Sequence, residues 1–391
     1  MTDLYGSDRY GYAELLSAPE LEVLSKLRTV LDEQVSPLLA GYWEAGEFPE
    51  QIRQPLVDLN LMAPDGATDS QGRTSALYGG FRNFELARTD ASVATYYNAQ
   101  SGLFRSTVLH GGSPEQAAEL DPKIRSFEYT GVFALTEPEH GSDIAGGLAT
   151  SARRDGDSWI INGAKRWIGG AGTADVLAVF ARDAADGQVK AFLVPREAEG
   201  VTLTKILHKT SLRMMQNFDI ELRGVRVPDS ARLAGINSFR DVASLMRRLR
   251  SDVAWIATGM QAGAYEAAVR YTLEREQFGK PLASFQLTQQ KLATMLANLT
   301  ASLGMVVRLT QRQEEGIFRD EDSAMAKMFT CTSLRETAAL AREVVGGNGI
   351  TLDTGVARFH ADAEAVYSYE GTHDINALIL GRSIAGVGAF H

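Results

Sequence analysis

The sequence predicts an α+β protein of three domains, in which a β barrel or sandwich separates two helical bundles. Apolar residues recur at helical spacing through residues 11–128, and again from residue 238 onward. Between them lie short β-branched or aromatic runs separated by Gly, Asp and Pro, the pattern of successive strands. Strands and helices do not alternate, which argues against a doubly wound nucleotide-binding sheet. Because 391 residues exceed what one core ordinarily holds, we predict domains at 1–128, 129–237 and 238–391.

Composition narrows the classes of partner. Hydrophobic residues at 45% and charged residues at 23% are ordinary for a soluble globular protein. The net charge of −10 argues against nucleic acid or an anionic membrane as the main partner. Because Cys331 is the only cysteine, an intrachain disulfide is excluded and a reducing, cytoplasmic location is expected. No apolar run of membrane-spanning length is evident, Met1–Asp3 is no secretory signal, and the six histidines form no metal-binding pair.

Capping residues and prolines punctuate the N-terminal region. Ser17 can cap a helix that carries Pro19 in its first turn and leucines at helical spacing after it, and Pro37 permits a break. A second apolar stretch, from about Tyr78 to Leu109, predicts one long helix that suits a bundle.

The remaining elements follow from run length and period. Strands are predicted at residues 133–135, 159–161, 176–180, 189–194, 201–204 and 218–222. Residues 239–276 contain no proline and predict one very long helix, and helical patterns also cover 285–312 and 320–345. Helices of this length usually form a bundle and often an oligomer interface.

Tyr369-Glu370-Gly371-Thr372 is the candidate reaction centre. A carboxylate between an aromatic ring and a glycine, beside an apolar run, suits a general base, because partial desolvation raises its pKa toward neutrality. Gly371 would let a substrate approach the backbone closely. These four residues leave a second interpretation open, in which Glu370 begins a solvated helix that Thr372 caps.

Four further segments could carry chemistry, and each has a structural alternative. Residues 135–143 end a strand with hydroxyls, acids and a glycine turn, or form a plain turn. Trp167, which precedes a glycine pair, could stack on a flat ligand or lie in the core. Arg275 could bind a phosphate oxygen or pair with a neighbouring glutamate. The glycines at 346–349 could admit a bulky ligand or only stop a helix.

Taken together and in this order, the five segments are far more specific, and the chain resembles the acyl-CoA dehydrogenase family along essentially its whole length. The resemblance rests on Thr-Glu-Pro-x-x-Gly-Ser-Asp at 136–143, Lys-x-Trp-Ile at 165–168, Arg-x-Gln-Phe-Gly at 275–279, Gly-Gly-Asn-Gly at 346–349 and Tyr-Glu-Gly-Thr at 369–372. Within the family, Tyr-Glu-Gly-Thr-His-Asp-Ile at 369–375, continuing to Gly-Arg at 381–382, is most similar to the glutaryl-CoA dehydrogenase branch, which includes some plant short-chain acyl-CoA oxidases.

The resemblance implies a C-terminal four-helix bundle after the N-terminal helical and middle β domains, assembly as a homotetramer, and one FAD per subunit. It implies α,β-dehydrogenation of an acyl-CoA thioester, in which Glu370 removes the α-proton while hydride passes to flavin N5. The Glu370 N–H and a flavin hydroxyl would bind the thioester carbonyl. Electrons would then pass to an electron-transfer flavoprotein or, in an oxidase, to O2.

The family's functional residues map onto positions in all three predicted domains. Trp167 would pack against the flavin, and the Arg275 segment would reach the FAD of a neighbouring subunit. The implied cofactor-binding residues are Leu135, Thr136, Gly141, Ser142, Trp167, Ile168, Gly169, Arg275, Gln277, Phe278, Gln286, Glu343, Gly346, Gly347, Thr372 and Asp374. The implied substrate-binding residues are Ala94, Asn98, Arg250, Tyr369, Gly371 and Arg382.

Two positions bear on the choice of base and of electron acceptor. Some relatives place the base directly before the arginine that matches Arg250, where this chain has Leu249, which cannot accept a proton. Most relatives have Thr or Ser after Trp-Ile, with a hydroxyl that binds flavin N5, where this chain has Gly169, so either a backbone N–H substitutes or N5 loses a donor. Both a dehydrogenase and an oxidase therefore stay open, and a non-catalytic subunit with the same fold is disfavoured by the intact motifs.

The predicted acyl pocket departs from that of the glutaryl-CoA dehydrogenases. Those enzymes hold the distal carboxylate with an arginine where this chain has Ala94, and Asn98 replaces a nearby serine. We therefore expect a short uncharged acyl group, because a buried carboxylate needs a charge partner. Arg82, Arg88 or Arg105 could supply that partner from another turn, which keeps glutaryl-CoA as an alternative.

Overall fold

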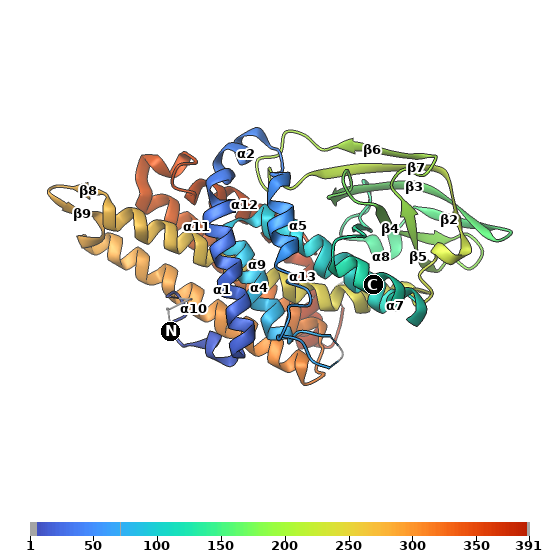
Figure 1. Cartoon of the computed structure of the whole chain (residues 1–391), viewed down its shortest axis with the longest axis horizontal. Helices are drawn as coiled ribbons and strands as arrows, with labels where there is room; N and C mark the ends of the chain where they lie inside the picture. The colour runs from blue at the N-terminus through green and yellow to red at the C-terminus, as the bar shows by residue number, and fades with distance from the viewer. Residues whose placement is uncertain (1–5, 71, 389–391) are drawn as a thin grey trace. The chain divides into compact units, whose positions relative to one another are not determined.

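Figure 1 shows the computed structural model, which describes residues 6–70 and 72–388. The predicted polar start, Met1–Asp3, lies outside the described residues. The chain forms two compact units. Unit 1 carries most of the helices and comprises Met1–Ala94, Thr210–Met214 and Arg250–His391. Unit 2 carries the large sheet and comprises Thr95–Lys209 and Met215–Leu249.

The first helices of unit 1 are α1 (Ala18–Val30), α2 (Leu39–Ala45), α3 (Arg53–Asp58) and α4 (Ala76–Thr89). The predicted cap is confirmed, since Ser17 caps α1 and its backbone N–H donates to the Glu20 carboxylate at 2.8 Å. Near Pro37 the chain does not stop. It continues through a π turn at Leu31–Val35 and a 3₁₀ turn at Ser36–Leu38 before α2 begins.

The prediction of one long helix over residues 78–109 is wrong. The segment is divided into α4, α5 (Ala91–Asn98), a π turn (Ala99–Phe104) and α6 (Arg105–Gly111). Asp90 is extended, with φ −166° and ψ 139°, and its carboxylate accepts a hydrogen bond from the N–H of Ser92 at 2.7 Å. Asp90 therefore ends one helix and caps the next, which apolar periodicity alone does not reveal.

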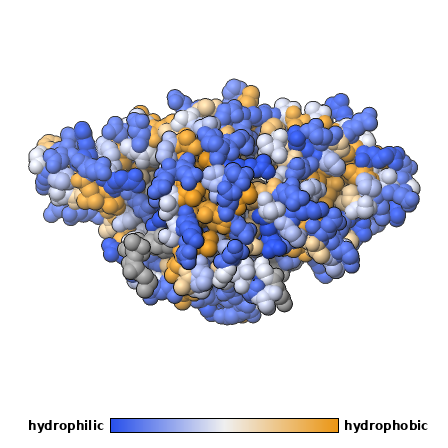
Figure 2. Space-filling view, viewed as in Figure 1, coloured by the Kyte–Doolittle hydropathy of each residue, from blue (hydrophilic) through white to orange (hydrophobic). Residues whose placement is uncertain are grey.

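The long C-terminal helices follow the sequence pattern closely. They are α9 (Phe239–Glu274), α10 (Gln286–Glu314), α11 (Asp320–Val345), α12 (Val356–Ser368) and α13 (His373–Ala385). A hairpin of β8 (Glu276–Gln277) and β9 (Lys280–Pro281) joins α9 to α10 and is visible at the end of that helix pair in Figure 1. Figure 2 shows hydrophobic residues between hydrophilic ones over the helices of unit 1.

Glycines bring α4 and α9 into backbone contact within unit 1. A Cβ on Gly259 would lie 2.2 Å from the carbonyl oxygen of Phe84, and one on Gly263 would lie 2.1 Å from that of Arg88. No side chain fits between the helices at these two positions. The contact fixes α4 against α9, the helix that also carries Arg250.

One described helix, α10, is long and apolar enough to cross a membrane by length and composition, with a mean hydropathy of 1.4 over its best window. The expectation that no such stretch exists therefore does not hold for these residues. Helices in the cores of bundles meet the same criterion, and α10 contributes Met295, Leu299 and Leu303 to the buried core.

Unit 2 is built on a seven-stranded sheet of order β1-β4-β2-β3-β7-β6, with β5 also paired to β4. The strands are β1 (Gly131–Ala134), β2 (Ser151–Asp155), β3 (Ser158–Gly169), β4 (Val176–Asp183), β5 (Val189–Pro195), β6 (Val201–Lys205) and β7 (Asn217–Pro228). The six predicted strands are confirmed and β2 was missed. Only Ala152 of β2 is buried, so its sequence shows no apolar alternation.

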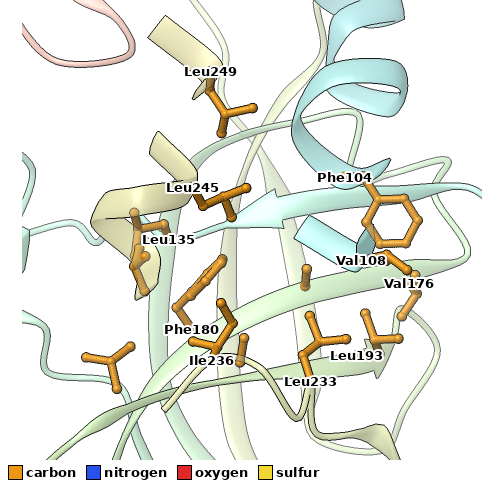
Figure 3. Packing of buried hydrophobic residues seen from close by; sticks show 14 of the residues in the cluster. Phe104, Val108, Leu135, Val176, Phe180, Leu193, Leu233, Ile236, Leu245 and Leu249 are labelled. Atoms are coloured by element: carbon orange, nitrogen blue, oxygen red, sulfur yellow. The ribbon is translucent and has the colours of Figure 1, made fainter. Parts of the chain in front are cut away.

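Apolar clusters cover both faces of the sheet. The cluster in Figure 3 joins strand residues such as Phe180 to Phe104 and Val108 of the preceding helical segment and to Leu245 and Leu249 at the start of α9. The helices α7 (Pro114–Arg125) and α8 (Ile144–Gly147) also belong to unit 2. The Leu249 side chain is 2% exposed and packs within this cluster, so it belongs to the hydrophobic core of unit 2.

Candidate active site

Glu370 lies on a left-handed turn between α12 and α13. Its φ is +54°, and Gly371 follows with φ +88°. A non-glycine residue in this region costs about 1–3 kcal/mol and persists where the surrounding structure over-determines it, commonly at functional sites. Glu370 is partly buried. The strain sits on the one residue of the turn that can act as a base.

Three side chains hold this turn. The ammonium of Lys327, on α11, donates to the carbonyl oxygens of Tyr369 and Gly371, on either side of Glu370. Asn376 donates from Nδ2 to the carbonyls of Gly371 and Thr372, at 2.9 Å each. Thr372 Oγ1 accepts from the N–H of Ile375 at 3.2 Å and so caps α13. The capping interpretation of Thr372 is therefore correct, but the helix begins at His373 rather than at Glu370.

Charged groups surround the Glu370 carboxylate within unit 1. Burial raises the pKa of Glu370, while the cations of Lys327 and Arg250 oppose that rise. Burial also raises the pKa of Asp252, on α9, to about 7; the Arg82 guanidinium opposes this shift and the Glu370 carboxylate adds to it. A carboxylate with a raised pKa and partial burial can accept a proton near neutral pH.

Sequence reasoning did not single out Lys327, Asp252 or Asn376. A lysine inside a helix is usually solvated, yet Lys327 is 1% exposed and shares the inward face of α11 with Ala324, Cys331 and Leu334. That spacing along α11 was the available signal, since it places Lys327 on the apolar stripe.

In unit 2, the segment after β1 is fixed by a buried ion pair. Lys165 Nζ lies 2.9 Å from Glu137 Oε1 and donates to the Leu135 carbonyl at 3.1 Å. Glu137 also accepts from the N–H groups of Ala149 at 2.7 Å and Thr150 at 2.9 Å. Burial lowers the pKa of Lys165 to about 8, against the effect of Glu137. The predicted residues on this segment are thereby positioned, with Leu135 buried, Thr136 partly exposed, and Gly141 and Ser142 exposed.

Trp167 is not a core residue. Its side chain is 52% exposed, its φ is +66°, and the Arg166 guanidinium lies 4.9 Å from its ring centroid. Ile168 beside it is buried, and Asn217 Nδ2 donates to the Trp167 carbonyl at 3.3 Å. The core interpretation of Trp167 is wrong, and an exposed ring on a constrained backbone suits stacking on a flat ligand.

The side chain of Met215 fills the space that a side chain at position 169 would occupy. A Cβ at this position would lie 2.3 Å from Cε of Met215, a residue only 2% exposed. Gly169 pairs with Asn217 in the β3–β7 ladder, and the N–H of Gly170 donates to the Gln216 carbonyl at 2.8 Å. The missing hydroxyl at position 169 is thus accompanied by a methionine packed over the glycine.

The hairpin between α9 and α10 presents Arg275, Gln277 and Phe278 to the surface. Phe278 is 93% exposed and has φ +53°. Within the described chain Arg275 forms no ion pair, so pairing with a neighbouring glutamate does not explain it. Gln286, the first residue of α10, is also exposed.

Other predicted cofactor residues lie at helix ends of unit 1. Glu343 pairs with Lys291 at 3.1 Å, which gives it a structural partner. Gly346 ends α11 with φ +66°, so the helix-stop interpretation is correct, and Gly347 beside it is exposed. Asp374 is exposed in the first turn of α13.

The predicted substrate residues differ in exposure. Ala94 and Asn98 are buried, Tyr369 and Gly371 belong to the turn, and Arg382 is exposed near the end of α13. Arg250 is held by Asp320, with 3.4 Å between Nη1 and Oδ1.

The three arginines that could replace a carboxylate-binding arginine have distinct partners. Arg88 forms ion pairs with Asp32 at 2.7 Å, Glu266 at 3.1 Å and Glu85 at 3.2 Å. Arg105 pairs with Asp121 at 2.6 Å. Arg82 is buried and interacts electrostatically with Asp252, beside Glu370. Arg82 therefore interacts with a carboxyl group that also interacts with Glu370.

Helical, β and helical parts follow one another in this chain order, and a partly buried carboxylate lies on a turn of the last part, as the sequence resemblance implies for a flavin-dependent thioester dehydrogenase. Residues 17–128, 132–225 and 239–385 match the N-terminal, middle and C-terminal domains of acyl-CoA dehydrogenases. The chain belongs to the acyl-CoA dehydrogenase family, oxidoreductases that act on CH–CH bonds. The predicted boundaries at 128 and 237 remain predictions.

Similar proteins agree with this assignment over the full length. A 3-(aryl)acrylate reductase of Clostridium sporogenes is 31% identical over 93% of this chain and 98% of its own. A crystal structure of glutaryl-CoA dehydrogenase from Mycobacterium smegmatis has a TM-score of 0.90 at 35% identity, and covers 99% of this chain and 100% of that one. A second, in complex with FADH2, has a TM-score of 0.91 at 31% identity and covers 98% of each chain.

The residues present fit a flavin cofactor. Trp167 offers a half-exposed aromatic face on a fixed backbone, and Thr136 and Ser142 offer hydroxyl groups on the segment that the Glu137–Lys165 pair immobilises. Arg275 offers a guanidinium with no carboxylate partner within the described residues, as binding a phosphate oxygen requires. These are the donor types and the aromatic surface that FAD needs.

Proposed function

We propose that this protein catalyses α,β-dehydrogenation of a short-chain, uncharged acyl-CoA, with Glu370 as the base. Acyl-CoA dehydrogenation with FAD is the activity of its family. The observation that carries the finer proposal is the left-handed turn at Glu370, whose carboxylate is partly buried and has a raised pKa. Bound FAD supplies the acceptor for the β-hydride.

The turn also offers a donor for the thioester carbonyl. In the described chain, the backbone N–H of Glu370 donates to no other group, whereas the N–H of Tyr369 donates to the Ala365 carbonyl at 2.9 Å. A free backbone N–H beside the base can stabilise negative charge on the carbonyl oxygen as the α-proton leaves. Glu370 would thus act through both its carboxylate and its amide.

An uncharged acyl group agrees with the charges near the turn. Ala94 cannot pair with a distal carboxylate, and Arg88 and Arg105 are each engaged in ion pairs. The charge of Arg82 interacts with the Asp252 carboxyl group, so a substrate carboxylate near Arg82 would meet that carboxyl group as well as the guanidinium. We therefore favour butyryl-CoA or a branched chain of similar size over glutaryl-CoA.

We further propose an electron-transfer flavoprotein as acceptor, with O2 as the alternative that Gly169 favours. The exposed Phe278 and its hairpin support a homotetramer in which that hairpin contacts another subunit. A cytoplasmic location is proposed from the single buried cysteine, Cys331. The acidic net charge supports the proposal that neither nucleic acid nor a membrane surface is a partner.

Glu370→Gln tests the proposal, because the amide is nearly isosteric but cannot accept the proton. FAD content and thermal stability should stay near wild type, while anaerobic bleaching of the flavin by butyryl-CoA slows by at least about 10²–10⁴-fold. Exposed Glu364→Gln, on the preceding helix, is the matched control and should bleach normally. Near-normal bleaching by Glu370→Gln would place the base elsewhere.

A further inference from the structure

Lys327 is unusual because its side chain is buried although, among the described residues, its ammonium pairs with no carboxylate. Its side chain is 1% exposed, and its ammonium donates to the carbonyls of Tyr369 and Gly371. Among the described residues it forms no salt bridge of its own. Burying an ammonium costs free energy unless its N–H groups find acceptors, and these two carbonyls supply acceptors to Lys327.

The geometry of the turn explains why the two carbonyls converge. Glu370 and Gly371 both have positive φ, and with this backbone the carbonyl oxygens of Tyr369 and Gly371 both reach the Lys327 ammonium. Without Lys327 the Gly371 carbonyl would keep its hydrogen bond from Asn376, but the Tyr369 carbonyl would lose its side-chain donor and the two converging oxygens would repel each other, which favours an ordinary backbone conformation at Glu370. Lysine reaches both with one tetrahedral ammonium, which the neutral Asn376 amide does not do.

The charge of Lys327 acts on the same residue. The groups that face it are Glu370 on the turn, Arg250 on α9 and Cys331 one turn along α11. Glu370 in turn faces Lys327, Arg250 and Asp252. Two cations and a second carboxyl group therefore set how readily Glu370 ionises, and Lys327 is the one that also fixes its backbone.

We propose that Lys327 is a positioning residue for catalysis: it holds Glu370 in the left-handed conformation and places a positive charge near its carboxylate. This inference rests on the proposed role of Glu370 as the base. Lys327 touches the backbone on both sides of Glu370 and does not itself exchange a proton with substrate.

Lys327→Met tests both parts, since it fills the same volume without donors or charge, and Lys327→Arg keeps the charge. Lys190→Met is the matched control, because Lys190 is also buried and donates to a backbone carbonyl, that of Asn237 at 3.3 Å, in unit 2. Two readouts are needed: the pH dependence of flavin bleaching by butyryl-CoA, and amide hydrogen exchange at residues 370–372, which does not depend on turnover.

In Lys327→Met the acid limb of the rate profile should move up by about one pH unit or more, because removing a cation raises the pKa of Glu370. The rate at neutral pH should fall about tenfold and recover partly in alkaline buffer. Exchange at residues 370–372 should be at least about tenfold faster. Lys327→Arg should keep the acid limb, and Lys190→Met should change neither readout.

An unchanged acid limb together with unchanged exchange in Lys327→Met would overturn the inference, as would an equal loss of rate at every pH with unchanged exchange. If Lys327→Met does not fold, Lys327→Gln, which keeps a neutral donor, is measured the same way and judged by the acid limb. Glu370→Gln separates the two proposals. If it stays active, the base is elsewhere, whereas if it is inactive and Lys327→Met is normal, only the role of Lys327 fails.

Discussion

Gly169→Ala is expected to destabilise unit 2 through a collision with Met215. The new Cβ would lie 2.3 Å from Met215 Cε, whereas non-bonded carbons rest about 3.5–4.0 Å apart, so the methyl must withdraw by more than about 1 Å. Met215 is 2% exposed, which leaves it no solvent-facing path. Because Cε is the end of a flexible side chain, Met215 can turn aside in part, so we expect the low end of the cost of overpacking, about 1 kcal/mol in the free energy of unfolding.

The contact can be isolated with a double-mutant cycle. Met215→Ala alone should cost about 2–5 kcal/mol through the cavity it leaves. In Gly169→Ala/Met215→Ala the new methyl group occupies part of that cavity, so the combined loss should fall short of the sum by about 1 kcal/mol. Gly146→Ala is the matched control, because nothing lies within 4 Å of its Cβ position in α8 of the same unit.

Thermal unfolding followed by circular dichroism and by flavin release measures each variant, at about 2–4 °C per kcal/mol for a unit of this size. Gly146→Ala should leave the Tm unchanged or slightly raised. Strictly additive losses in the cycle, or a Tm for Gly169→Ala that matches Gly146→Ala, would refute the proposed contact between residues 169 and 215.

Three further outcomes are expected. Glu137→Gln should lower the free energy of unfolding by about 3–5 kcal/mol, because it leaves the buried Lys165 ammonium without its carboxylate. Burial raises the pKa of Glu137, but Lys165 and the hydrogen bonds to it outweigh burial and hold that pKa below the usual 4.5. The ionised Glu137 carboxylate therefore stabilises the folded state above pH 4.5, and this stabilisation is lost as pH falls through the lower pKa that Glu137 has in the folded state. Denaturation at several acid pH values measures this loss. Equal acid sensitivity of wild type and Glu137→Gln would contradict it. Gly169→Thr in the Met215→Ala background should slow reoxidation of the substrate-reduced flavin in air, measured by stopped flow against Met215→Ala alone; equal rates would remove Gly169 from the explanation. Finally, kcat/KM should favour butyryl-CoA over glutaryl-CoA by at least about 3 kcal/mol because Ala94 offers no charge partner, and a preference for glutaryl-CoA with release of carbon dioxide would end that reasoning.

The fold could be predicted from the sequence where one period dominates a segment. Helix α11 begins and ends at the predicted residues, 320 and 345, and α9 ends two residues before its predicted end at 276, since no proline interrupts either one. Periodicity failed where a polar side chain redirects the backbone, as Asp90 does between α4 and α5. It also failed at β2, whose pairing with β3 depends on backbone hydrogen bonds rather than on apolar side chains.

The candidate site divides along similar lines. Residues with a distinctive local motif, such as Glu370 and Trp167, could be nominated because glycines mark the turns that carry them. Lys327 and Asp252 were not, because they interact with a turn that is distant in sequence, and the only local signal was the place of Lys327 on the apolar stripe of α11. A sequence motif records the turn itself but not the buried charges that make it stable.

The positive φ at Glu370 places thermal stability in conflict with the proposed catalytic role of one residue. Glycine at position 370 would adopt the same backbone without strain, which would favour the folded state by about 1 kcal/mol or more, but it would carry no carboxylate. Directed evolution screened on thermostability alone would therefore be drawn toward inactive protein at this position. A stabilising library should hold residue 370 fixed and draw its gains from helix-interior glycines with open surroundings, such as Gly79.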